Sequence, residues 1–156
     1  MQEQERSVIE RFCQGVIDKD SKQVESVLAP WLCRDPGPEQ LISVLHGAAL
    51  DELRPAGFVV EDIDPMSLEE LRGFIQEYYG KGGTRSLRSL ESGGDMGPPS
   101  IPLPEEINTQ NFLAYGMAHL TPAEGANSFI DYCLRLYFVL VDDGSGLKVG
   151  WIEPSL

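Results

Sequence analysis

The side chains best suited to acid–base or ligand chemistry lie in the C-terminal part of this sequence, inside two runs rich in apolar residues. They are Tyr115 and His119 in the first run, and Asp131, Arg135 and Tyr137 in the second. Side chains alternate between the two faces of a β-strand, so each set is expected to lie on a single face of its own strand. The spacing leaves open whether the two sets share one face of the sheet.

His119 and Asp131 would form a general acid–base pair if they faced each other across neighbouring strands, because a carboxylate would then lie beside an imidazole. A connection over residues 120–130 places them opposite each other, whereas a register shift of two residues separates them. The alternative is an ordinary polar contact near the rim of the sheet. Both explanations are open at this point.

Arg135 and Tyr137 also have a purely structural explanation. If their strand turns back through residues 142–146, Arg135 faces Glu153 and Tyr137 faces Trp151 on the next strand. Cross-strand pairs of this kind stabilise a sheet by about 0.2–1 kcal/mol each without any ligand.

The sequence contains no pattern that predicts a metal or cofactor site. His46 and His119 are the only histidines, and neither has a second ligand at helical or hairpin spacing. Cys13, Cys33 and Cys133 form no C-x-x-C pair, so we expect neither a zinc site nor a disulfide framework, and Cys133 is expected to be an inert buried thiol. No phosphate-binding, nucleophile-elbow or dinucleotide motif occurs, and we therefore expect no cofactor.

Charge narrows the choice of partners. Asp and Glu outnumber Lys and Arg by 25 to 12, which gives a formal charge of −13. Such a surface repels phosphate groups, so we expect neither nucleic acid nor an anionic membrane as a partner. The N-terminus is charged, and no stretch approaches the ~18 apolar residues of a membrane span, so the sequence favours a cytoplasmic protein.

The 156 residues, 42% of them hydrophobic, suit a single α+β domain over residues 1–156. Apolar periodicity predicts helices around residues 8–17, 24–32 and 41–53, and Pro30 is expected to end or bend the second of them. Asp20 and Gln23 have the form of an N-cap with an amide that reaches back to it. A fourth helix is expected from the capping box of Ser67 and Glu70 to Gly80, with Phe74 in its buried stripe. Strands are expected at 58–63, 112–120, 128–141 and 147–153, the last three as an antiparallel meander. Residues 81–111 are rich in Gly and Pro and are expected to form a long loop.

This order of elements resembles the nuclear transport factor 2-like (cystatin-like) α+β cone. Residues 12–20 leading into residues 24–32 resemble that family's opening of a helix, an acidic turn and a second helix. The long strand expected at 128–141 ends in a Gly-containing hairpin, and residues 148–154 resemble the family's final strand. The resemblance implies N-terminal helices packed on one face of a curved C-terminal sheet, with a pocket between them. It also implies that the five residues named first would line that pocket and bind its ligand. No tyrosine precedes Tyr78, so the catalytic pattern of the family's ketosteroid isomerases is not carried over.

Three hypotheses of function follow. The first is a cone-type domain without a catalytic signature, which binds a small apolar ligand or forms a homodimer through its sheet. The second is an acidic interaction protein, such as an immunity-type inhibitor of a basic partner, since residues 51–77 hold eight acidic and two basic residues. The third is an isomerase- or dehydratase-like enzyme. The sequence names no substrate, reaction or oligomeric state.

Overall fold

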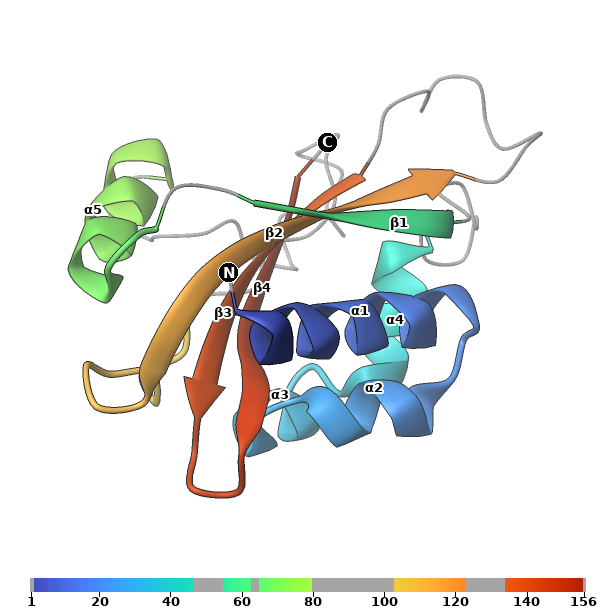
Figure 1. Ribbon diagram of the computed structural model, residues 1–156, viewed down its shortest axis with the longest axis horizontal. Helices are drawn as coiled ribbons and strands as arrows, with labels where there is room; N and C mark the ends of the chain where they lie inside the picture. The colour runs from blue at the N-terminus through green and yellow to red at the C-terminus, as the bar shows by residue number, and fades with distance from the viewer. Residues whose placement is uncertain (1, 47–54, 63–64, 80–102, 123–133, 156) are drawn as a thin grey trace.

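The computed structural model describes residues 2–46, 55–62, 65–79, 103–122 and 134–155. The helices and strands follow in the order α1 (Glu3–Ile17), α2 (Ser21–Val27), α3 (Pro30–Arg34), α4 (Pro38–Leu45), β1 (Pro55–Glu61), α5 (Leu68–Tyr79), β2 (Phe112–Pro122), β3 (Leu134–Asp142) and β4 (Leu147–Ser155) (Figure 1). The strands form one open antiparallel sheet in the order β1-β2-β3-β4. The predicted α+β class, with a C-terminal antiparallel meander, is confirmed.

Side-chain caps start two of the helices where the sequence indicates. The Asp20 carboxylate accepts the backbone N–H of Gln23 at 3.2 Å, and the Ser67 hydroxyl accepts that of Glu70 at 3.1 Å. Each bond satisfies a helical N–H that has no partner within its own helix. The capping pattern predicted that the side-chain amide of Gln23 reaches back to Asp20. Instead, this amide donates to the carbonyl of Arg11 at 2.9 Å.

Pro30 divides the second predicted helix into two. The α2 helix ends at Val27, and Pro30 occupies the first turn of α3, where its missing N–H leaves no bond unmade. The extended residues between the helices bring Leu28 beside Val149, and the N–H of Ala29 donates to the Val149 carbonyl at 2.9 Å. Pro30 thus follows a short extended connection, Leu28 and Ala29, that pairs with the edge strand β4 at Val149.

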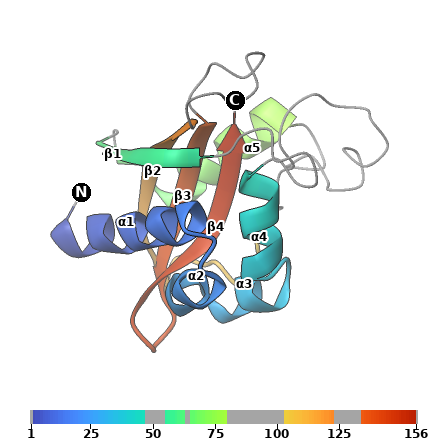
Figure 2. The same cartoon turned by 90° about the vertical axis from the view of Figure 1, so that its right-hand side faces the viewer.

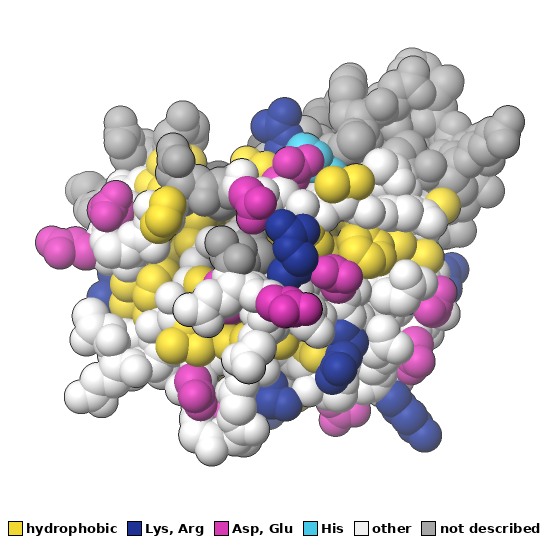
Figure 3. Space-filling model, viewed as in Figure 1, with side chains coloured by type: hydrophobic (Ala, Val, Ile, Leu, Met, Phe, Trp, Pro, Cys, Tyr) yellow, Lys and Arg dark blue, Asp and Glu magenta, His cyan; other side chains and the backbone are white. Residues whose placement is uncertain are grey.

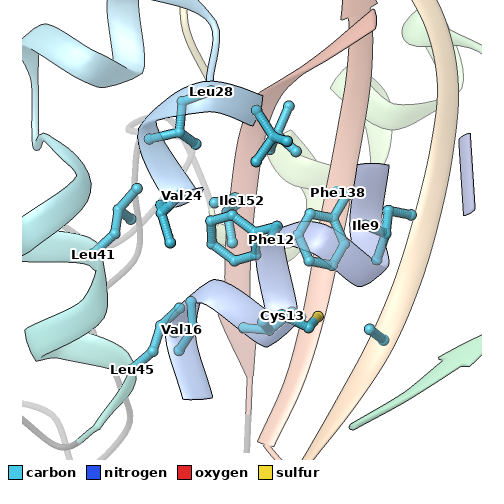
Figure 4. Packing of buried hydrophobic residues seen from close by; sticks show 14 of the residues in the cluster. Ile9, Phe12, Cys13, Val16, Val24, Leu28, Leu41, Leu45, Phe138 and Ile152 are labelled. Atoms are coloured by element: carbon cyan, nitrogen blue, oxygen red, sulfur yellow. The ribbon is translucent and has the colours of Figure 1, made fainter. Parts of the chain in front are cut away.

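One face of the sheet packs against α1, α2 and α4. Phe138 on β3 meets Phe12 on α1 edge to face, with ring centroids 5.5 Å apart and planes at 78°. Ile9, Cys13 and Ile152 lie in the same cluster, and all are fully buried (Figure 4). On β3 this inner face is formed by the alternate residues Leu136, Phe138 and Leu140, as the period of two predicted.

The N-terminal helices do lie on one face as expected, but the opposite face carries a second core with α5, which the expectation did not include (Figure 2). Leu68, Leu71 and Ile75 of α5 pack in a cluster with Val139 and Trp151. The apolar positions on the outer face of the long strand require such a cover.

Phe74 corrects a further detail of the prediction. It was expected in the buried stripe of α5, yet 40% of its surface is exposed. Leu68, Leu71 and Ile75 follow the i, i+3, i+7 spacing of one helix face, and Phe74 lies at the margin of that face.

Among the described residues, no helix has the length and apolar character needed to cross a bilayer.

A β-bulge at Gly150 sets the register between β3 and β4. Val139 pairs with Trp151 and Leu140 with Val149, so Gly150 is the extra residue. Its carbonyl accepts the indole N–H of Trp31 at 2.8 Å. The bulge accounts for one residue of the two-residue difference from the expected register, and the hairpin accounts for the other, because Leu147 pairs with Asp142 rather than with Val141.

The true register changes the partners of both candidate residues on β3. Tyr137 faces Glu153 instead of Trp151, and Arg135 faces Ser155 instead of Glu153.

At the opposite edge of the sheet from β4, the guanidinium of Arg6 reaches β1, where it donates to the Val60 carbonyl at 3.4 Å and pairs with Asp62 at 3.1 Å. Both edge strands thus have carbonyl groups bonded to side chains, which makes them poorer templates for further strands.

Replacing Gly150 by Ala tests the bulge. A Cβ at this position would lie 2.8 Å from a methyl carbon of Val141, which is fully buried, and 3.3 Å from the Trp31 ring. We expect Gly150→Ala to lower the free energy of unfolding by about 1–3 kcal/mol in urea denaturation, because the packed neighbours must shift.

Gly73→Ala is the matched control for Gly150→Ala. A Cβ at Gly73 on α5 would meet no atom within 4 Å. Alanine is the better helix former, so this change should raise stability by about 0.5–1 kcal/mol. Equal effects of the two substitutions would contradict the close packing around the bulge.

Candidate functional site

The structure brings four of the five candidate residues to one face of the sheet. His119 pairs directly with Arg135, Met117 with Tyr137, and Tyr115 lies two residues before Met117 on the same strand. Directly paired residues share a face, and residues two apart on a strand also share it. Tyr115, His119, Arg135 and Tyr137 therefore all lie on the outer face, opposite α1. Asp131 lies outside the described residues.

The two tyrosines stack on each other. The rings of Tyr115 and Tyr137 have centroids 6.0 Å apart and planes only 4° from parallel. Both side chains are half-buried against the α5 cluster. On the other side of Tyr137 lies Glu153, which is only 3% exposed and was not among the candidate residues. The two tyrosines therefore lie between the apolar outer core and the polar residues His119, Arg135 and Glu153.

His119 has a carboxylate partner, but not the one considered from the sequence. Its Nδ1 lies 3.3 Å from Oε1 of Glu61 on β1, and the residue opposite it on β3 is Arg135 rather than Asp131. The side chain of His119 is 25% exposed and that of Glu61 40%. Glu61 escaped the sequence analysis because the pairing of β1 with β2 spans more than fifty residues. The contact links the side chains of β1 and β2 at a position that is partly accessible to solvent.

The space between the sheet and the N-terminal helices is filled by side chains in the described part of the chain. Phe12, Phe138, Val16 and Leu45 have no exposed surface and lie together in this layer (Figure 4). Cys13 lies among them, and burial, reinforced by the charge of Glu10, raises the pKa of its thiol. Cys13 is therefore a poor nucleophile.

A groove of about 390 Å³ lies on the outside of the molecule, between the start of α1 and the start of β2. Its apolar lining consists of Pro65, Met66, Leu113, Ala114 and Tyr115. Its polar lining consists of Gln2 and Glu5. Figure 3 shows hydrophobic side chains gathered in this region, between α5 and the first part of β2.

Leu113 is the most unusual residue of the groove, because 48% of this large apolar side chain is exposed. A register irregularity in β2 accounts for it. Phe112 pairs with Val141 and Ala114 with Leu140, so Leu113 is an extra residue between them. The described lining of the groove comes from three segments far apart in the chain, residues 2–5, 65–66 and 113–115. Among these described residues, Tyr115 was the one candidate predicted from the sequence.

No metal-binding cluster of His, Cys, Asp and Glu occurs among the residues that the structure describes. Comparison of the chain with models of protein families, with curated proteins and with solved structures gave no match.

Removing an aromatic ring from the inner layer tests whether that layer is filled. Phe12→Ala should lower the free energy of unfolding by about 3–5 kcal/mol, because it leaves a cavity in a rigid core. Val59→Ala is the control, since 52% of the Val59 side chain is exposed and its loss should change stability by at most about 0.5 kcal/mol. If Phe12→Ala were as mild as Val59→Ala, the layer would have to contain unfilled space.

Proposed function

We propose that this protein is a non-catalytic binding domain that takes a small apolar ligand in the groove at Leu113. The observation that carries the proposal is the half-exposed Leu113 side chain, presented by a strand irregularity beside Met66 and Tyr115. An apolar side chain of this size in contact with water is stabilised when a ligand covers it. Covering the rest of Leu113 would contribute about 1 kcal/mol of binding free energy.

The dimensions and chemistry of the groove suit a small molecule. Its volume of about 390 Å³ falls within the ~300–1,000 Å³ usual for ligand pockets. Five of the seven described residues that line it are apolar, and the two polar ones lie at the start of α1. Such a lining would bind the body of a ligand through burial and orient it through few polar contacts.

The packed inner layer supports the groove over a pocket of the cone type. A ligand between α1 and the sheet would have to displace fully buried residues such as Phe12 and Phe138. The groove needs no such rearrangement, because Leu113 is already accessible. The ligand would therefore bind along the edge of β2 at residues 113–115, beside the start of α1 and beyond the last pair with β1 at Met117. Among the described candidate residues, Tyr115 is the one that lines the groove.

An uncharged fluorescent probe, N-phenyl-1-naphthylamine, tests this proposal directly. We expect saturable binding to the wild-type protein, with the blue shift and brightening of a dye in an apolar site. Leu113→Asp should weaken binding at least about tenfold, because a buried carboxylate in an apolar site costs more than the ~1.4 kcal/mol that a factor of ten represents.

Val59→Asp is the matched control for Leu113→Asp. The two side chains have similar exposure, 52% and 48%, and Val59 does not line the groove. This variant should bind the probe like the wild type, and both variants should keep the wild-type circular dichroism. Failure of the wild type to bind the probe, or equal binding by Leu113→Asp, would refute the proposal.

A further inference from the structure

The groove carries a formal charge as well as an apolar surface. Among the described residues that line it, Glu5 is the one that is charged at neutral pH. Its carboxylate is held in place, because Oε2 accepts the backbone N–H of Gln2 at 3.1 Å. A carboxylate offers about four lone-pair positions, so this single bond leaves it able to accept further donors.

Arg6, the base nearest to Glu5 in the sequence, is directed away from the groove. Its guanidinium pairs with Asp62 at 3.1 Å and donates to the Val60 carbonyl at 3.4 Å, both on the β1 side of α1. Among the described residues that line the groove, no cation balances the Glu5 carboxylate.

The helix dipole at the start of α1 makes a smaller contribution to the charge of the groove, and its sign is opposite to that of Glu5. The N-terminus of a helix acts like roughly half a positive charge and attracts anions. Here the first turn already holds two full negative charges, those of Glu3 and Glu5. The negative charge therefore dominates, and it agrees in sign with the net charge of −13 of the whole chain.

From these observations we infer that the ligand of the groove is an apolar chain with a cationic ammonium head, which pairs with Glu5 while the chain covers Leu113 and Met66. An ammonium group supplies three N–H donors, and a charge-assisted bond to a carboxylate is stronger than a neutral one. An apolar carboxylate of the same length would place two like charges together. This inference rests on the proposed function, since it assumes that the groove binds apolar molecules.

Displacement of N-phenyl-1-naphthylamine by three ten-carbon compounds tests the inference. Decylamine, decanol and decanoate share one chain and differ only in the head group. At pH 7 and low salt, the two charged compounds would be used below their micelle concentrations and decanol below its solubility limit. We expect decylamine to displace the probe at least about fivefold more tightly than decanol, and decanoate to be the weakest. Raising the salt concentration should reduce the preference for decylamine.

Two variants assign the preference to one side chain. Glu5→Gln removes the charge but keeps an acceptor for the N–H of Gln2, so α1 should remain capped and the melting temperature nearly unchanged. In this variant decylamine should bind only as tightly as decanol, while decanol itself is unaffected. Glu3→Gln, on the same turn but outside the groove lining, should keep the wild-type preference.

The outcomes separate the two proposals. Probe binding without a preference for decylamine, or a preference that survives in Glu5→Gln, would overturn the cationic ligand and leave the apolar groove standing. Absence of probe binding to the wild type would overturn both. Should Glu5→Gln unfold, the loss of preference with salt in the wild-type protein gives the same decision, because a preference independent of salt contradicts pairing with an accessible carboxylate.

Discussion

Burial of β3 on both of its faces is the constraint on which the rest of the described structure depends. Leu136, Phe138 and Leu140 have no exposed surface on one face, and neither do Val139 and Val141 on the other. A strand of this kind is stable only when each face is covered. The α1, α2 and α4 helices cover one face and α5 covers part of the other, which explains why the helices lie on both sides (Figure 2).

This double burial also decides where binding can occur. Side chains occupy the layer between the N-terminal helices and the sheet, so a ligand there would compete with the core for the same space. The outer face is less completely covered, with Tyr115 half-buried and Leu113 48% exposed. Binding is therefore expected where the second core ends, and the irregularity in β2 supplies the accessible apolar side chain there.

Much of the architecture could be predicted from the sequence because its signals are local. The Ser67 cap, the break at Pro30 and the alternation along β3 each depend on residues within one element. The register of β4 was predicted wrongly because it depends on both the pairing at the hairpin, where Leu147 faces Asp142, and the bulge at Gly150, although a glycine inside a strand was a usable warning of the bulge. The His119–Glu61 contact and the groove join segments distant in sequence, and no periodicity within one segment reports on such a contact.

The most direct test of this account is to map the binding position by amide chemical-shift changes as N-phenyl-1-naphthylamine is added to the labelled protein. The account predicts that the largest changes fall on residues 113–115, on Met66 and on the first turn of α1, which together form the groove. Changes concentrated instead around Phe12 and Phe138 would place the ligand between the helices and the sheet, and would contradict the claim that this layer is a filled core.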